Sequence, residues 1–157
     1  MTVFRSLLFL CLVPGLLVGW FPYVVSTSDV ELLAWGWLKF FALPFWGAGW
    51  AAMVWCFWNF MITGRGTPAP IDPPKELVVV GLYRFVRNPM YVAGILVLIG
   101  WLLWSPSPPL LLAPLIFFGA VHLFVTLYEE PTLKKKFGAA YEAYLQRVPR
   151  WLPRRAQ

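Results

Sequence analysis

Apolar residues occur in long runs that short polar segments separate. The first run extends from Phe4 to Val25, and the second from Leu32 to Ile62. Both are long enough for a helix that crosses a bilayer, which takes about 20 residues. Arg5 before a leucine-rich stretch also fits a signal peptide, but no small-residue cleavage site follows, so we expect a retained first helix. In the second run, Trp35 and Trp37 predict an interfacial lead-in, followed by a span that ends near Ile62.

Two further apolar runs lie close together in the second half of the chain. Asn88 followed by Pro89 is typical of a helix start, which predicts a third span from there to Trp104. A short Ser/Pro turn at residues 105–109 leads into a fourth span, from Leu110 to about Tyr128. So short a connection predicts an antiparallel hairpin. Its two helices are expected to approach closely at small residues, namely Gly94, Gly100, Gly119 and Ala120.

The last segment has a different periodicity. After Pro131, which is expected to restart the chain, apolar residues recur at three- or four-residue steps with charged residues between them. This pattern predicts an amphipathic helix on the membrane surface. The apolar positions are Leu133, Phe137, Tyr141, Tyr144 and Val148, and a basic tail follows at Arg150, Arg154 and Arg155.

Composition supports a membrane protein. Of the 157 residues, 60% are hydrophobic and 13% are charged, and there are ten tryptophans; the mean hydropathy is +0.68. A soluble domain of this length could not bury so much apolar surface, and neither a disordered chain nor a coiled coil has this composition. The sequence therefore predicts an all-α integral membrane protein of about four transmembrane helices. It forms one domain over residues 1–157, with two spans in 1–62 and the loop, hairpin and tail in 63–157.

The distribution of charge predicts an orientation. Apart from Lys39, the basic residues lie near residue 5, in the polar 63–90 loop or after residue 130, whereas the 26–31 and 105–109 breaks hold none. Four spans with both termini in the cytoplasm then satisfy the positive-inside rule in an inner or plasma membrane. The net charge of +6 is expected to face anionic lipid, not nucleic acid. One histidine and two cysteines are too few for a metal site.

Candidate chemistry lies at the expected cytoplasmic end of the hairpin. Glu129 and Glu130 follow the fourth span, and residues 88–91 begin the third, so the hairpin makes them neighbours. Carboxylates at a membrane boundary are costly unless they are paired or functional. From the residues alone, a functional site and simple pairing of these glutamates with Arg84 and Arg87 are equally favoured.

A longer motif resembles a known family. The sequence GLYRFVRNPMY at 81–91, the apolar hairpin, Glu129-Glu130, Phe137-Gly138, Tyr141, Tyr144 and Arg147-Val148-Pro149 are similar to the isoprenylcysteine carboxyl methyltransferases. That family belongs to a wider group with the membrane phospholipid N-methyltransferases. The resemblance covers roughly residues 63–153.

The resemblance implies a cytoplasmic pocket for S-adenosylmethionine. By position, the cofactor-binding residues would be Lys75, Glu76, Leu77, Val78, Tyr83, Asn88, Pro89, Met90, Tyr91 and Glu129. Glu129 suits a cationic sulfonium or amino group, and the tyrosines suit the adenosine. Arg84 and Arg87 are expected to brace the loop against Glu130, carbonyls or lipid phosphate. Glu129 and Glu130 are the candidate catalytic residues, with Glu130 or water as the proton acceptor for an amine.

Two departures from the family pattern bear on the acceptor. Asn88 stands where the carboxyl methyltransferases have histidine, and Val125 stands where the eukaryotic members have an arginine that engages the substrate. We therefore expect a small lipophilic or lipid-borne acceptor in place of a prenylcysteine carboxylate. The alternatives are a carboxyl O-methyltransferase proper, a catalytically silent membrane scaffold of the same fold, and a membrane reductase, since sterol reductases have a related carboxyl-terminal architecture.

Overall fold

In the computed structural model, every element of the described part of the chain is helical. The structure describes residue 8 and residues 12–27, 36–64 and 75–153. The elements are η1 (Gly15–Trp20), α2 (Phe21–Ser26), η2 (Gly36–Phe41), α3 (Ala42–Ile62), η3 (Gly81–Arg84), α4 (Pro89–Trp104), α5 (Pro108–Phe124), η4 (Val125–Glu129), α6 (Glu130–Phe137) and α7 (Ala139–Arg147). Of the four η segments, η1 and η4 are π-helical and η2 and η3 are 3₁₀-helical.

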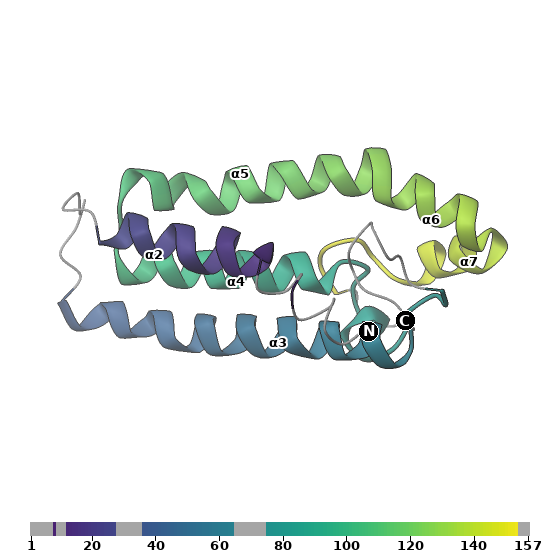
Figure 1. The fold of residues 1–157 in the computed structure, drawn as a ribbon, viewed down its shortest axis with the longest axis horizontal. Helices are drawn as coiled ribbons and strands as arrows, with labels where there is room; N and C mark the ends of the chain where they lie inside the picture. The colour runs from purple at the N-terminus through teal and green to yellow at the C-terminus, as the bar shows by residue number, and fades with distance from the viewer. Residues whose placement is uncertain (1–7, 9–11, 28–35, 65–74, 154–157) are drawn as a thin grey trace.

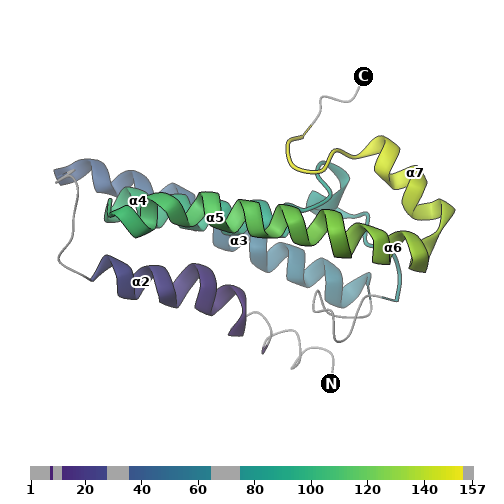
Figure 2. The same ribbon diagram turned by 90° about the horizontal axis from the view of Figure 1, so that it is seen from above.

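The longer helices run side by side along one axis of the molecule. Figure 1 shows the axes of α3, α4 and α5 lying nearly along one line of the molecule, with α2 beside them. Figure 2 shows α2 set to one side of the α4–α5 hairpin. The hairpin is antiparallel, as predicted, and its turn lies at one end of the molecule. At the other end are η3, the start of α4, and α6 and α7.

The expected four spans are reproduced only in part by helix length. Gly36–Ile62 and Pro108–Phe137 are long and apolar enough to cross a membrane, whereas Gly15–Ser26 and Pro89–Trp104 are shorter apolar helices. The predicted end of the second span at Ile62 is confirmed. Residues 4–7 and 9–11 of the first predicted span, together with Trp35, lie outside the described residues.

The apolar core of the bundle lies between η1, α3 and α4. Its buried members are Val18, Met53, Phe57, Ala93, Val97 and Leu98. The outward faces are also apolar: Leu115 on α5 is 67% exposed and Leu127 on η4 is 75% exposed. Because a helix that is apolar on every side needs an apolar solvent, these faces are suited to lipid.

Aromatic residues gather around Lys39 at the turn end of the bundle. The ammonium group of Lys39 lies 5.1 Å from the ring centroid of Trp104. The Trp46 and Trp101 rings meet edge to face at 4.8 Å, and Trp37 is 71% exposed. This arrangement agrees with the interfacial lead-in predicted around Trp37.

The small residues of the hairpin have different roles from those predicted. Gly94 does approach α5, because a Cβ there would lie 3.1 Å from the Phe117 ring. Gly100 instead faces the Trp46 ring of α3. Gly119 meets no atom within 4 Å, and both it and Ala120 are exposed. The prediction was wrong for these two because they lie on the outward face of α5.

This difference gives a paired stability prediction. Gly94→Val is expected to lower the free energy of unfolding by about 1–3 kcal/mol, since the added methyl groups overpack against Phe117. Gly119→Val fills open space on a helix and should change stability by less than about 1 kcal/mol. Thermal unfolding in detergent compares the two variants. Equal destabilisation would contradict the packing described here.

The fourth helix does not end near Tyr128, and Pro131 does not restart the chain. The helix continues from Pro108 to Phe137 through the π turn of η4. A proline ring clashes with the carbonyl four residues earlier in a regular helix. The wider π turn directly before Pro131 relieves this clash, because its hydrogen bonds reach five residues instead of four.

The predicted amphipathic surface helix is two helices, and its apolar face is buried in protein. Gly138 separates α6 from α7 with φ +51°, a conformation that favours glycine. Tyr141, Tyr144 and Val148 are buried and pack with Leu77 of the preceding loop. The prediction of a lipid-facing stripe was wrong because the 75–83 segment covers it.

Candidate functional site

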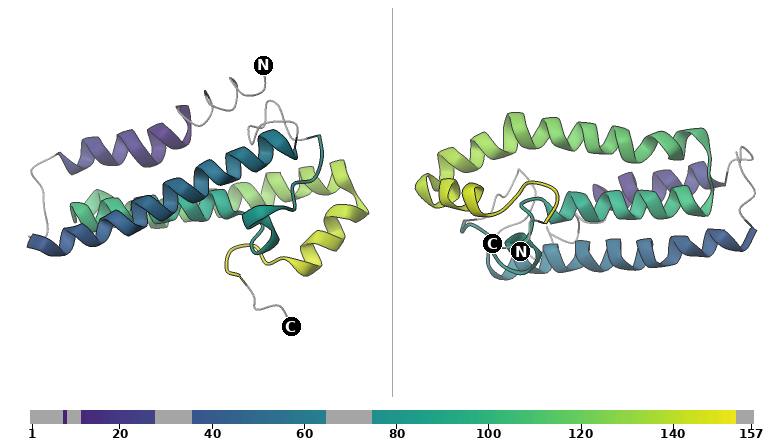
Figure 3. Two further views of the ribbon diagram at one scale, coloured as in Figure 1. Left: turned by 90° about the horizontal axis from the view of Figure 1, so that it is seen from below. Right: turned by 180° about the vertical axis from the view of Figure 1, so that it is seen from behind.

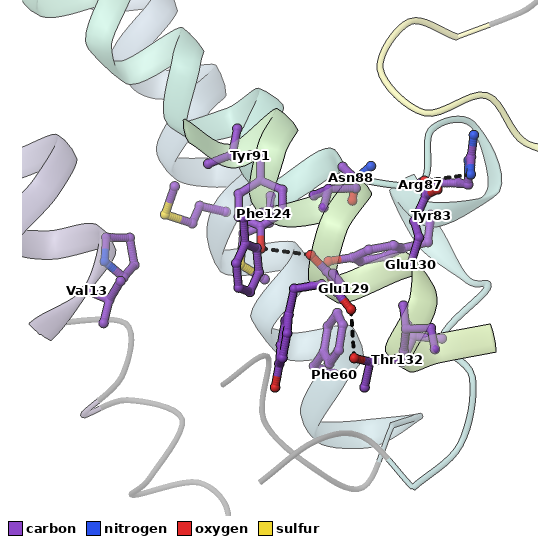
Figure 4. Close-up of a pocket in the computed structure, with 18 of the residues that line it drawn as sticks. Val13, Phe60, Tyr83, Arg87, Asn88, Tyr91, Phe124, Glu129, Glu130 and Thr132 are labelled. Atoms are coloured by element: carbon purple, nitrogen blue, oxygen red, sulfur yellow. Dashed lines mark hydrogen bonds and ion pairs between the residues drawn. The ribbon is translucent and has the colours of Figure 1, made fainter. Parts of the chain in front are cut away.

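A cavity of about 470 Å³ opens at the end of the bundle where α4 begins and η4 meets α6. Figure 4 shows side chains from the loop, α3, α4 and the η4–α6 junction converging on it. Most of the predicted cofactor-binding residues line this cavity, namely Leu77, Val78, Tyr83, Asn88, Met90, Tyr91 and Glu129. The second candidate catalytic residue, Glu130, lines it as well. The structure thus brings together segments that are about 50 residues apart in the sequence.

Three predicted cofactor-binding residues do not line the cavity. Lys75 and Glu76 are exposed, and Pro89 is buried at the first position of α4. The Lys75 amide donates to the Gly64 carbonyl at 2.8 Å, which joins this segment to the end of α3. Lys75 therefore anchors the backbone of the loop, and the lining begins at Leu77.

Tyr91 and Glu129, which both line the cavity, meet across the hairpin. The Tyr91 hydroxyl donates to Glu129 Oε2 at 3.0 Å, as Figure 4 shows. Among the described residues, no basic side chain pairs with Glu129. The cavity therefore presents a partly buried carboxylate that is oriented by a phenol and has no cationic partner.

Glu130 is bound by two arginines. Arg87 Nη1 and Arg150 Nε both donate to Oε1 at 2.8 Å, and Arg150 Nη2 donates to Oε2 at 2.9 Å. The prediction that Arg87 braces the loop against Glu130 is confirmed, while Arg84 is exposed. Both Glu130 oxygens thus accept charge-assisted hydrogen bonds from guanidinium groups, which joins Arg87 to Arg150 through this carboxylate.

Asn88 precedes α4 as predicted, but its side chain does not cap the helix. The amide Nδ2 instead donates to the carbonyl of Arg150 at 3.2 Å. This partner was missed because residues 149–151 return to the start of α4 from 62 positions further along the chain. The local sequence contains no signal for that approach.

Two tyrosines of α7 close one side of the cavity and were not predicted as site residues. The Tyr144 hydroxyl donates to the Tyr83 carbonyl at 2.7 Å, which ties α7 to η3. Burial raises the pKa of Tyr144, and burial raises the pKa of Tyr141 to about 12. Both phenols thus stay protonated around neutral pH. Their three-residue spacing was visible in the sequence but was interpreted as a lipid-facing stripe.

The π turn of η4 places Glu129 at the cavity. It spans Val125–Glu129 and ends where α6 starts. Within it, the Thr126 hydroxyl donates a hydrogen bond to the His122 carbonyl at 2.7 Å. An extra residue in a helical turn rotates the residues after it around the helix axis. Glu129 therefore faces Tyr91, while the adjacent Glu130 faces the arginines.

The rest of the cavity is apolar and reaches toward the side of the bundle. Val18, Met53, Phe117, Val121 and Val125 belong to its lining. At its rim, Val13, just before η1, is 41% exposed, Leu17 of η1 is 54% exposed and Phe124 of α5 is 38% exposed. Figure 4 shows Val13 on the far side of the cavity from Glu129. The first helix was not predicted to contribute to the site.

The described residues thus form a helical bundle with two helices long and apolar enough to cross a membrane. One end of the bundle holds a cavity that is lined by Arg87, Glu129, Glu130 and mostly apolar residues, and the described ranges contain no cluster of metal-ligating residues. The family model for phospholipid methyltransferases (PEMT) matches residues 37–140. The chain belongs to this family. The relation to the isoprenylcysteine and phospholipid methyltransferase group, which the motifs indicated, is thereby confirmed.

Two relatives show how the similarity is distributed. An uncharacterized protein of Haemophilus influenzae is 38% identical over 63 residues, which are 40% of this chain and all of that protein. The Delta(14)-sterol reductase LBR of Gallus gallus is 35% identical over 81 residues, which are 51% of this chain and 13% of the reductase. The predicted relation to sterol reductases is therefore found over a small part of that protein. No solved structure matches the chain.

Proposed function

We propose that this protein is an S-adenosylmethionine-dependent membrane methyltransferase that acts on a small lipophilic or lipid-borne acceptor. The proposal rests mainly on the Glu129 carboxylate of a chain from a methyltransferase family: Tyr91 holds it in the cavity, and it has no cationic partner among the described residues. A carboxylate without a cationic partner favours a ligand that brings its own positive charge.

The described lining fits this cofactor in three respects. Glu129 suits its cationic sulfonium or ammonium group, and the Tyr83 and Tyr91 rings suit its adenosine. Arg87 Nε is buried and has no hydrogen-bond partner among the described residues, so it suits the carboxylate of the methionyl group. When bound, the cofactor supplies an electrophilic methyl group.

Transfer of that group is an in-line displacement that needs alignment and exclusion of water more than a strong base. Glu129 and Tyr91 orient the cofactor, and the apolar lining excludes water. Since Glu130 is bound by two guanidinium groups, we assign it to holding the cavity mouth and not to proton transfer. For an amine acceptor, the proton goes to Glu129 or water; a carboxylate or thiolate acceptor releases none.

The lining also supports an uncharged or cationic acceptor. Val125, at the position of the family's substrate arginine, is buried and lines the cavity. His122 does not line the cavity. Its Nδ1 accepts a hydrogen bond from the Trp151 indole at 3.2 Å. Arg87 is the basic residue of the described lining; its Nη1 is paired with Glu130, and its Nε is assigned here to the cofactor carboxylate. An anionic acceptor would therefore lack a free counter-charge.

A tritiated-methyl assay on the purified protein tests the acceptor. Extracted membrane lipids should become labelled, and N-acetyl-farnesylcysteine should be a poor substrate or inactive. Saturable methylation of farnesylcysteine with no labelled lipid would contradict the acceptor class. It would establish the carboxyl O-methyltransferase alternative in its place.

Membrane orientation belongs to the same proposal. Four spans with cytoplasmic termini would set the cavity at the cytoplasmic face. Pro109 at the turn and Gln146 on α7 are both exposed, so single cysteines there, in a chain without Cys11 and Cys56, report the two ends. We expect Pro109→Cys to be labelled from outside intact cells, and Gln146→Cys only after permeabilisation. The reverse pattern would place the cavity on the outer face.

The similarity to a sterol reductase supports a second candidate function, reduction of a lipid. The two functions differ in their cofactor, because a reductase would oxidise a nicotinamide and bind S-adenosylhomocysteine no better than other nucleosides. Nicotinamide oxidation that depends on added lipid, without transfer of a methyl group, would favour the reductase.

A further inference from the structure

Residues 149–151, here called the C-terminal strap, connect the two helices of the hairpin at the cavity end. The Pro149 carbonyl accepts from the Arg87 amide at 2.9 Å, and the Arg150 carbonyl accepts from Asn88 Nδ2 at 3.2 Å. On the α5 side, the Trp151 indole donates to His122. Figure 3 shows the chain after α7 passing back to the start of α4. The strap therefore fixes the segment that leads into Tyr91.

Arg150 adds the most specific contact of the strap. Its guanidinium donates from Nε and Nη2 to the two oxygens of Glu130, the fork geometry in which arginine binds carboxylates most strongly. Hydrogen bonding to Glu130 also raises the pKa of Arg150, so the guanidinium stays protonated. Arg150 does not line the cavity, whereas Glu130 does.

The strap also determines the charge balance beside the cofactor cavity. Glu129 and Glu130 are consecutive, and like charges this close disfavour one another. Arg87 and Arg150 together balance the two carboxylates. With Arg150 absent, Arg87 would be the one guanidinium of this cluster beside both glutamates. Among the described residues, Arg87 and Arg150 both bind Glu130, and neither pairs with Glu129.

We infer that Arg150 is a positioning residue for cofactor binding: it acts through Glu130 and Asn88 to hold Glu129 and Tyr91 in their facing arrangement. This inference rests on the proposed cofactor site and adds a residue to it that does not touch the cavity. The same strap also contacts Tyr91 itself, since the ring centroids of Trp151 and Tyr91 are 6.5 Å apart.

The test uses the full-length protein in detergent and three variants. Arg150→Gln removes the charge, Arg150→Lys keeps the charge without the fork, and Arg147→Gln makes the same change at an exposed arginine three residues earlier. Calorimetry gives the dissociation constant and the stoichiometry of S-adenosylhomocysteine, and thermal unfolding gives the melting temperature. The stoichiometry separates weaker binding from loss of folded protein.

Arg150→Gln is expected to raise the dissociation constant about ten-fold at unchanged stoichiometry, the scale of one charged hydrogen bond. Arg150→Lys should fall between it and the wild type, and Arg147→Gln should match the wild type. An unchanged dissociation constant with a lower melting temperature or stoichiometry would overturn the inference, because Arg150 would then stabilise the fold without affecting cofactor binding. Should Arg150→Gln not fold, the lysine variant decides, since a wild-type constant there would equally overturn it. Absence of binding by the wild type would instead reject the proposed function.

Discussion

Glu129→Gln is expected to weaken cofactor binding by about 1–3 kcal/mol, or roughly 5- to 150-fold in the dissociation constant, the scale of a lost charged hydrogen bond. Glutamine keeps the size of the side chain and its hydrogen bond from Tyr91, but it removes the charge that faces the cavity. Calorimetry should compare S-adenosylmethionine with S-adenosylhomocysteine. The latter has the amino group but no sulfonium, so a larger loss for S-adenosylmethionine would place Glu129 at the sulfonium.

The matched control is Lys135→Gln on α6, which changes an exposed charge one turn and a half away. It should bind both ligands as the wild type does. Equal affinity of the wild type and Glu129→Gln for both ligands would remove Glu129 from the cofactor site. The proposed function would then lose the observation that carries it.

Glu130→Ala is expected to have the largest effect on stability. The Arg87 side chain is 13% exposed and its Glu130 partner 11% exposed. Removing the carboxylate leaves a buried guanidinium without its counter-charge, a change that costs about 3–5 kcal/mol. Arg150 loses both of its side-chain hydrogen bonds at the same time. Thermal unfolding in detergent measures the loss.

Glu142→Ala on α7 is the control, because Glu142 is exposed. Its effect should lie within about 0.5 kcal/mol of zero, as for most surface substitutions. If the two variants unfold at the same temperature, the Arg87–Glu130–Arg150 cluster does not hold the cavity end together.

Much of the helical framework could be predicted because it depends on local patterns. The end of α3 at Ile62 and the start of α4 at Pro89 follow from the polar loop between them and from proline chemistry. The antiparallel hairpin follows from a turn too short for any other arrangement. Glu129 and Tyr91 were expected to be neighbours for the same reason, and their hydrogen bond confirms that they are.

The remaining features depend on contacts between distant segments. Pro131 was expected to interrupt the helix, and only the preceding π turn explains why it does not. Asn88 carries the sequence signal of a helix cap, but its amide donates to Arg150, whose approach depends on how α6 and α7 turn at Gly138. The α7 tyrosines show the limit of periodicity, which identifies an apolar face but not what covers it.

The most direct test of the central claim is calorimetric titration of the wild-type protein with S-adenosylhomocysteine in detergent, with adenosine and a nicotinamide dinucleotide as comparison ligands. We expect saturable binding of one S-adenosylhomocysteine per chain, and much weaker binding of the comparison ligands. A chain that is folded by thermal unfolding but binds S-adenosylhomocysteine no more tightly than adenosine would contradict the assignment of this cavity to a methyltransferase.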